Sequence, residues 1–264
     1  MSSQIQEHSV WQAIREEAKQ ASLDEPVLAS FYHATILNHA SFEAAISFHL
    51  ANKLDSQAVP AMMIREVFEL ALDGDPGLAL AMLRDIQAYR ERDPACDQFI
   101  MPFLYFKGFH ALQAHRIAHW LWSEQRQALA LYLQNQISQV LGVDIHPGAR
   151  VGSGIMIDHA TGVVVGETAV IEDNVSLLHS VTLGGSGCGS GDRHPKIRQG
   201  VLISAGAKIL GNIEIGEGAK VGAGSVVLEP VAPHTTVAGV PAVVVGRPTV
   251  EQPALNMDHQ LNES

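Results

Sequence analysis

Two short segments of this sequence carry side chains that can move a proton and hold a carboxylate. The first is Asp158-His159. Histidine has an unperturbed pKa of about 6.5, so His159 can act as a general base at neutral pH. The second is Arg193-His194, which can bind a carboxylate through paired hydrogen bonds. Without other information, a stacking or capping histidine and an exposed polar loop tip are equally good interpretations of these two segments.

Three acids are candidates to orient the ring of His159. They are Asp158, Asp144 and Glu167. Asp144 precedes His159 by fifteen residues, three short of the eighteen that make a full coil of the repeat described next. The spacing alone therefore does not prove that these two side chains meet.

The scaffold of these segments is a repeat in which an aliphatic residue returns every six positions. A fixed period indicates a solenoid, and a six-residue period with glycine-rich corners indicates a β-helix in which three hexapeptides make one triangular coil. An ordinary parallel sheet is disfavoured, because no helix-length segment separates the strands. The inward positions are Ile145, Val151, Ile157, Val165, Ile171, Leu177, Leu183, Ile197, Ile203, Ile209, Ile215, Val221 and Val227.

The period breaks at both chemistry-bearing segments. An eight-residue step separates Ile157 from Val165, and fourteen residues separate Leu183 from Ile197. The second break is rich in glycine, so we expect a loop extruded from the coil. Departures from a regular scaffold are where function is expected.

The chain ahead of the repeat is predicted to be helical. Only four of the 23 glycines lie in residues 1–142. The pairs Glu25-Pro26, Asp75-Pro76 and Asp93-Pro94 each predict the start of a helix. We predict an α+β protein with three parts: a helical capping and oligomerisation domain over 1–142, a β-helix over 143–242, and a polar tail over 243–264.

Composition limits the function classes. A net charge of −11 without a basic block argues against nucleic acid or an anionic membrane as partner. No signal peptide or apolar run of about 20 residues is visible, so a cytoplasmic protein is expected.

Cys96 and Cys188 are expected to be reduced. His115 and His119 have a spacing that can hold a metal on a helix, but no third ligand accompanies them, so no metal is predicted.

Several longer motifs, together with the helical first half, carry a family resemblance over nearly the whole chain. They lie at residues 28–34, 93–94, 107–113, 143–147, 158–162, 166–169, 180–185, 191–197 and 239–242. With them the chain resembles the bacterial serine acetyltransferases, hexapeptide-repeat enzymes that make O-acetylserine from L-serine and acetyl-CoA in cysteine synthesis. The resemblance implies a left-handed β-helix, a handedness that the six-residue period does not determine.

The resemblance also implies residue roles. His159 would take the proton from the serine hydroxyl, and Asp144 would orient and polarise it. The hydroxyl would then attack the thioester directly in a ternary complex. Cys188 has no paired base, so an acyl-cysteine intermediate is not expected. The serine-binding set would be Asp93 from a neighbouring subunit, Asp158, Arg193, His194 and, as an additional acid, Glu167.

Coenzyme A would lie in the groove between adjacent prisms of a trimer. Small residues would let the pantetheine arm approach the backbone, and two lysines would meet its phosphates. The implied set is Gly185, Ser204, Ala205, Gly206, Lys208, Lys220, Ala223 and Gly224.

The resemblance further implies partners for the chain. Two trimers would form a homohexamer through the helical domains, and L-cysteine would inhibit. In this family the tail docks on O-acetylserine sulfhydrylase through a terminal isoleucine. This chain ends at Ser264 instead. That departure makes the sulfhydrylase a doubtful partner.

Three other functions fit parts of the pattern. The first is a β-helix transferase acting on a sugar or xenobiotic hydroxyl, although Arg193, His194 and two aspartates suit a small zwitterion better. The second is a γ-type carbonic anhydrase, for which His159, His179 and His194 would have to surround zinc at a subunit boundary. The third is a purely structural scaffold, which has no need for a base and an extruded loop together.

Overall fold

The structure is a computed structural model that describes residues 2–187 and 190–261. The chain divides into two compact units, Met1–Phe106 and Lys107–Ser264. The predicted boundary at 142/143 is where helices give way to strands, but α7 and α8 belong to the second unit with the β-helix.

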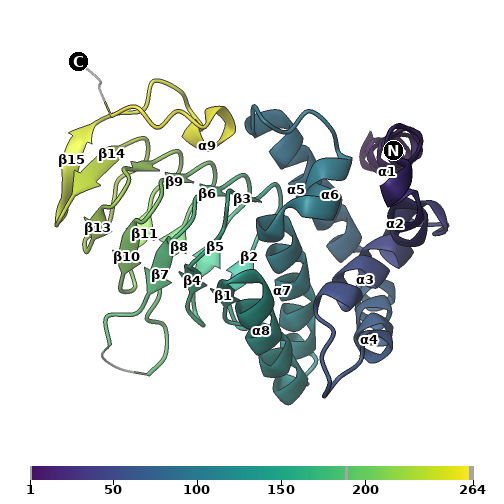
Figure 1. Ribbon diagram of the computed structural model, residues 1–264. Coiled ribbons are helices and arrows are strands. Elements are labelled where there is room, and N and C mark those ends of the chain that lie inside the picture. Colours follow the sequence, from purple (N-terminus) through teal and green to yellow (C-terminus); the bar gives the residue numbers. More distant parts are fainter. Residues whose placement is uncertain (1, 188–189, 262–264) are drawn as a thin grey trace. The chain divides into compact units, whose positions relative to one another are not determined.

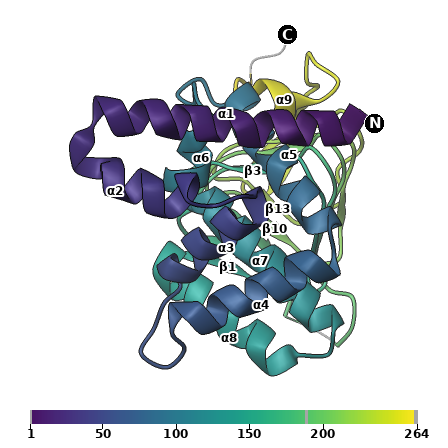
Figure 2. The ribbon, with the colours of Figure 1, turned by 90° about the vertical axis from the view of Figure 1, so that its right-hand side faces the viewer.

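The first unit is helical, with α1 running beside α2 and α3 beside α4 (Figure 2). Its core is aromatic and aliphatic: the rings of Trp11, Phe42 and Phe103 pack together, and Ile14 is fully buried. The elements are α1 (Ser2–Asp24), η1 (Pro26–Leu28), α2 (Ala29–Tyr32), η2 (His33–Leu37), α3 (Phe42–Lys53), α4 (Ala61–Gly74), α5 (Gly77–Arg92) and α6 (Ile100–Tyr105).

The three acid-proline pairs begin different local structures. Asp75 Oδ1 accepts a hydrogen bond from the backbone N–H of Gly77 at 2.9 Å, and α5 begins there. Pro26 opens the short η1 helix. The prediction for Asp93-Pro94 is wrong, because Asp93 ends α5 and its Oδ1 accepts from Ala95 N at 2.9 Å in a turn. An aspartate that accepts from the backbone two residues on makes a turn as readily as a helix start.

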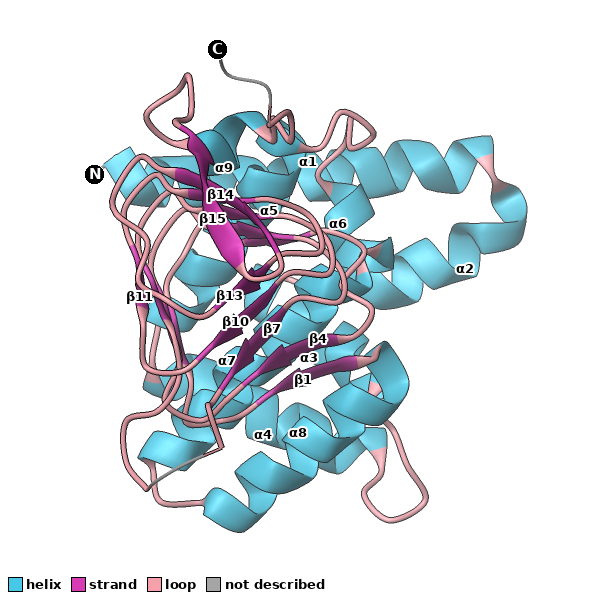
Figure 3. Ribbon diagram, turned by 90° about the vertical axis from the view of Figure 1, so that its left-hand side faces the viewer, coloured by secondary structure: helices cyan, strands magenta, loops and turns pink. Residues whose placement is uncertain are grey.

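The second unit begins with α7 (Lys107–Ser123) and α8 (Gln127–Leu141) and continues as a β-helix (Figure 1). Viewed from the end at β15, the strands form the sides of a hollow prism whose interior the side chains fill (Figure 3). The strands are β1 (Val143–Ile145), β2 (Arg150–Val151), β3 (Met156–Ile157), β4 (Val163–Val165), β5 (Val170–Ile171), β6 (Ser176–Leu177), β7 (Thr182–Gly184), β8 (Lys196–Ile197), β9 (Leu202–Ile203), β10 (Lys208–Leu210), β11 (Glu214–Ile215), β12 (Lys220–Val221), β13 (Val226–Val227), β14 (Thr236–Gly239) and β15 (Ala242–Gly246).

Three sheets make the sides of the prism. We call them sheet A (β1-β4-β7-β10-β13), sheet B (β2-β5-β8-β11) and sheet C (β3-β6-β9-β12-β14-β15). All pairings are parallel except β14 with β15. The predicted inward residues are buried, and only Val151, in the first coil, is half-buried. The six-residue period therefore predicted the β-helix and its core correctly.

Helices α7 and α8 pack against the first coil, where an open β-helix would leave backbone groups unpaired. Arg116 donates to the carbonyls of Val151 at 3.1 Å and Gly152 at 2.6 Å. Gly142 ends α8 with a φ of +68°, a left-handed conformation that glycine adopts readily, and turns the chain into β1. Burial lowers the pKa of His115 on α7 to about 3, so this imidazole is neutral at physiological pH.

The C-terminal segment is more ordered than a polar tail. β15 continues to Gly246, and α9 (Pro253–Asn256) packs on sheet C, where Ser176 Oγ donates to the Ala254 carbonyl at 2.9 Å.

None of the helices in the described part of the chain is long and apolar enough to cross a membrane. Cys96 is a free, buried thiol whose pKa burial raises to about 11. Cys188 and residues 262–264 lie outside the described residues.

Candidate functional site

The predicted site residues of the β-helix gather mainly on two edges of the prism. The first, which we call the His159 edge, is the corner where the chain passes from sheet C to sheet A; it includes residues 158–162, 178–181, 204–207 and 222–225. The second, the Arg193 edge, is the corner from sheet A to sheet B, with residues 146–149, 166–169, 185–187, 190–195 and 211–213. Sheet A separates the two edges.

His159 stands out from its edge. Its side chain is 76% exposed, and its backbone has a φ of 56°. The corner is held by hydrogen bonds from Asp158 N to Leu177 O at 2.8 Å and from Gly162 N to Gly142 O at 2.8 Å. Non-glycine residues seldom adopt positive φ, and such strain clusters at functional positions. An exposed imidazole on a rigid corner suits a general base.

Two of the acids expected to orient the His159 ring, Asp158 and Asp144, lie in different surroundings. Asp158 Oδ2 lies 3.8 Å from His159 Nε2. Asp144 faces outward from β1, where its Oδ1 accepts from Gln134 Nε2 on α8 at 2.7 Å. A bond between Asp144 and His159 is thus not among the contacts that the described residues make, and the orienting role of Asp144 stays a prediction.

A column of in-register residues runs along the His159 edge. Ile157 pairs with Leu177, Leu177 with Ile203, and Ile203 with Val221. Two residues after each of these come His159, His179, Ala205 and Ala223. The first two coils thus carry imidazoles and the later two carry only methyl groups, with Gly206 and Gly224 beside them. A narrow acyl chain could lie along those later coils and reach His159.

The three larger side chains predicted to bind coenzyme A are already bonded within the chain. Lys208 Nζ donates to the Ser180 carbonyl. Ser204 Oγ pairs with His259 Nδ1 at 2.9 Å. Lys220 is only 1% exposed, and its Nζ donates to the Gln260 carbonyl under the C-terminal segment. A phosphate could reach Lys220 only if that segment moved.

The Arg193 edge is organised around an ion pair. Arg193 donates to Glu167 Oε2 at 2.6 Å and to the Gly191 carbonyl at 3.0 Å. The Arg193 guanidinium holds the pKa of the Glu167 carboxyl below its usual range. A carboxylate that binds Arg193 would therefore have to share the guanidinium with Glu167 or replace it.

His194 is fixed beside this pair, with 7% of its surface exposed. Its Nδ1 accepts from the backbone N–H of Thr168 at 3.2 Å, so the neutral ring carries its proton on Nε2. Burial lowers its pKa, and the neighbouring Arg193 charge acts in the same direction. The ring lies against Gly166, where a Cβ atom would come within 2.0 Å of its Nε2 and Cδ2. Only glycine leaves room there.

Sequence reasoning missed three residues that position this edge. Thr168 Oγ1 accepts from the backbone N–H groups of Arg193 at 3.0 Å and His194 at 3.2 Å, and it pairs with His194 Nδ1 at 2.9 Å. Lys196 Nζ donates to the carbonyls of Thr168 and His194 at 2.9 and 2.8 Å. His146 stacks edge-on against Trp122, with ring centroids 5.0 Å apart. All three residues stand in motifs of the resemblance, which offered a signal, but the six-residue period assigned them no role.

The structure does not gather all predicted residues into one site. Arg193, His194, Glu167 and Gly185 lie on the Arg193 edge, and Asp93 lies in the other unit. The three histidines of the zinc alternative likewise do not meet within one chain, since His159 and His179 lie on one edge and His194 on the other. The described residues contain no group of three or more His, Cys, Asp or Glu placed to hold a metal ion.

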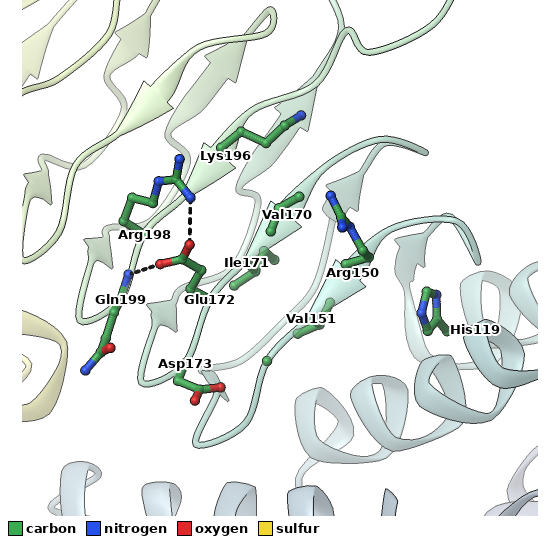
Figure 4. A pocket seen from close by; sticks show the side chains of 11 residues that line it. His119, Arg150, Val151, Val170, Ile171, Glu172, Asp173, Lys196, Arg198 and Gln199 are labelled. Carbon is green, nitrogen blue, oxygen red and sulfur yellow. Dashed lines mark hydrogen bonds and ion pairs between the residues drawn. The ribbon is translucent and has the colours of Figure 1, made fainter. Parts of the chain in front are cut away.

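A cavity of about 780 Å³ lies on the outer face of sheet B (Figure 4). Arg150, Lys196 and Arg198 contribute its positive charge, and Arg198 pairs with Glu172 at 2.7 Å. None of the predicted site residues lines it. Arg198 pairs with Glu172, and Lys196 pairs with Asp192, so two of the three basic side chains already have acidic partners. We therefore assign the cavity no ligand.

The β-helix and its six-residue repeat place the protein among the transferases built on hexapeptide repeats. Residues 194–229 match the family described as bacterial transferase hexapeptide (six repeats). Residues 10–114 match the family described as serine acetyltransferase, N-terminal. A serine acetyltransferase of Salmonella typhimurium is 62% identical over 253 residues, which cover 96% of this chain and 93% of that protein. The chain belongs to the serine acetyltransferase family.

The solved structures of relatives include complexes with ligands. A serine acetyltransferase in complex with cysteine is 56% identical with a TM-score of 0.95, over 96% of this chain and 99% of that one. A serine acetyltransferase of Brucella abortus strain S19 in complex with coenzyme A is 54% identical with a TM-score of 0.89, over 90% of this chain and 96% of that one.

Proposed function

We propose that this protein transfers the acetyl group of acetyl-CoA to the hydroxyl of L-serine, giving O-acetyl-L-serine and coenzyme A. The observation that carries the proposal is the exposed His159 on an edge that continues into Ala205, Gly206, Ala223 and Gly224. This puts the proposed base at one end of a row of small residues, along which a pantetheine arm can approach the backbone. The identity of 62% with a serine acetyltransferase over nearly the full length supports serine as the acceptor.

In this mechanism His159 removes the serine proton as the hydroxyl oxygen attacks the thioester carbon. The C–O bond forms, the thioester oxygen becomes an oxyanion, and collapse breaks the C–S bond. The departing thiolate then takes the proton from His159. Asp158, at 3.8 Å from the ring, stabilises the imidazolium and, with Asp93 from a neighbouring subunit, holds the serine ammonium group. Asp144 orients the base.

Serine would bind between two chains. Its carboxylate would be held by Arg193 and His194, with Glu167 beside them, and its hydroxyl would meet His159. Within one chain these groups lie on different edges, and the strands of sheet A between them span about 10 Å at 3.3 Å per residue. Serine is too small to touch both edges. A trimer in which the His159 edge of one prism faces the Arg193 edge of the next would bring them together.

Coenzyme A would lie in the same groove, along Ala205, Gly206, Ala223 and Gly224, with Gly185 contributed from the facing edge. Lys208 would leave the Ser180 carbonyl to meet a phosphate. Ser204 and Lys220 would join this site only after the C-terminal segment lifts from sheet C.

The remaining proposals concern assembly and regulation. Two trimers would join through the helical units into a hexamer. L-cysteine would inhibit by occupying the serine site, which is supported by the relative solved with cysteine. Because acetyl-CoA is made inside the cell, the protein would work in the cytoplasm.

The test is thiol release from acetyl-CoA, measured with L-serine, with glucose or chloramphenicol as other hydroxyl acceptors, and without acceptor. We expect release that depends on L-serine and that L-cysteine suppresses in competition with serine. Release with a sugar or the antibiotic but not with serine would favour the alternative acyltransferase and overturn the proposal.

A further inference from the structure

His146 lies at the first turn of the Arg193 edge, beside the residues proposed to bind the serine carboxylate. Its backbone N–H donates to the Val165 carbonyl at 2.9 Å, which fixes it against the next coil. Its half-buried ring lies edge-on to that of Trp122 on α7, with centroids 5.0 Å apart and planes inclined by 76°. The ring is therefore held at a defined place on this edge.

A backbone hydrogen bond determines which nitrogen of this ring carries the proton. Nδ1 of His146 accepts from the N–H of Gly148 at 3.0 Å. Since a neutral imidazole has one N–H and one lone pair, the proton is on Nε2. Burial lowers the pKa of His146, and the Arg193 charge acts in the same direction. The carboxylates of Glu167 and Asp144 oppose this lowering of the pKa only in part. The ring is thus a neutral donor at physiological pH, and none of the described residues accepts a hydrogen bond from its Nε2.

Glu167 lies against the same glycine as this ring. A Cβ atom at Gly148 would come within 3.1 Å of Glu167 Cγ and 3.2 Å of His146 Nδ1. The glycine thus lets the two side chains approach each other. The pKa of Glu167 is lowered mainly by its bond to Arg193 and further by charge on His146. The Glu167 carboxylate therefore has two groups near it that can donate a hydrogen bond.

Substrate binding would change which of these groups Glu167 needs. Its Oε2 accepts from Arg193 Nη2 at 2.6 Å, and a serine carboxylate that binds the guanidinium bidentately competes with this oxygen. A partly buried carboxylate that loses its donor is costly, so a second donor favours the exchange. His194 is assigned to the substrate, and Lys196 Nζ already donates to three oxygens. The Nε2–H of His146 is not engaged in this way.

We propose that His146 is a positioning residue whose Nε2–H donates a hydrogen bond to the Glu167 carboxylate when the substrate carboxylate takes its place on Arg193. This role rests on the proposed acetyl transfer to serine and on the proposed binding of its carboxylate by Arg193. No covalent bond forms or breaks. A hydrogen bond from Arg193 to Glu167 is exchanged for one from His146, and the guanidinium is left for the substrate. The exchange acts on substrate binding and leaves the chemical step unchanged.

Two variants of the full-length protein separate this donor from the turn that the same ring supports. His146→Asn keeps an acceptor for Gly148 N, because asparagine accepts from the backbone two residues on, but it has no donor near Nε2. His146→Gln places an amide N–H₂ near Nε2 and loses that acceptor. We expect Asn to raise the KM for L-serine about tenfold, the effect of one hydrogen bond to a charged group, and Gln to stay within about threefold. In both variants kcat and the KM for acetyl-CoA should change less than about threefold.

A second background tests whether the effect passes through Glu167. Glu167→Ala removes the carboxylate that needs the donor. We therefore expect His146→Asn to change the KM for L-serine less than about twofold when it is added to Glu167→Ala. Such a loss of effect is the coupling that a double-mutant cycle measures between two interacting side chains.

The outcomes separate the donor from a structural role. If His146 only supports the turn, Gln should raise the KM for L-serine more than Asn, and equal or reversed values would overturn the proposal. A KM within about twofold of normal for Asn would also overturn it, as would the same fold-change for Asn with and without Glu167. If the Gln variant does not fold, the cycle with Asn still decides. Failure of the unmodified protein to release thiol with L-serine would overturn the proposed function itself, whereas serine-dependent release with unchanged KM values would overturn the role of His146 alone.

Discussion

The His159→Asn variant is expected to lose serine-dependent kcat by about a thousandfold, within the range measured for general bases. Without the imidazole, the serine hydroxyl keeps its proton and is a poor nucleophile. The fold should survive, because the side chain is 76% exposed and asparagine tolerates the φ of 56° found at this position. Steady-state thiol release and a thermal melt measure the two effects.

Added imidazole provides the control for this variant. The exposed position leaves space for a free imidazole molecule in place of the side chain, so we expect it to restore part of the rate in His159→Asn and to leave the unmodified enzyme unchanged. A variant that keeps more than about a tenth of the normal kcat would show that His159 is not the base.

The Thr168→Val variant is expected to raise the KM for L-serine by ten- to a hundredfold. Valine has the shape of threonine but lacks the hydroxyl that bonds Arg193 N at 3.0 Å, His194 N at 3.2 Å and His194 Nδ1 at 2.9 Å. Each buried group left unpaired costs about 1–3 kcal/mol, and 1.4 kcal/mol is tenfold in affinity. The Arg193-His194 segment should then leave the position in which it binds a carboxylate.

Thr168→Ser is the matched control, since it keeps the hydroxyl and loses only a methyl group. We expect serine to restore a near-normal KM while valine does not. The KM for acetyl-CoA should change little in either variant, because Thr168 lies on the Arg193 edge and not along the proposed path of pantetheine. Equal KM values for L-serine in the two variants would contradict the positioning role of Thr168.

The sequence predicted the solenoid well because its core obeys one rule. Every coil needs an inward aliphatic residue at each strand, and a six-residue period from Ile145 to Val227 satisfies that need with only local information. The extruded loop was predictable for the converse reason, since the step of fourteen residues from Leu183 to Ile197 is too long for one hexapeptide.

The spacing of residues along the chain could not predict how the site residues are arranged in space. Whether His159 and Arg193 share an edge depends on how many corners separate them, and the irregular steps at the loop change that count. The contacts of Thr168 reach 25 and 26 residues along the chain to Arg193 and His194, so no local pattern reveals them. The covering of Lys220 by Gln260 is likewise a tertiary contact that composition cannot show.

In the helical half, some of the predicted helix starts were right and one was wrong, for a related reason. An acid before proline predicts the start of a helix, but the same pair also suits a turn, and whether a helix follows depends on later residues. After Asp75-Pro76 a helix of sixteen residues forms, whereas after Asp93-Pro94 the chain turns and α6 begins only at Ile100. Tertiary packing decides between these outcomes, and local propensity does not.

The most direct test of a site shared between chains is to mix two inactive variants. His159→Asn keeps an intact Arg193 edge, and Arg193→Met keeps an intact His159 edge. After unfolding together in equal amounts and refolding, random trimers should contain roughly a quarter of interfaces with both edges intact, and thiol release with L-serine should return to about that fraction of normal. Activity no greater than that of the two variants refolded separately would contradict a site assembled from two chains.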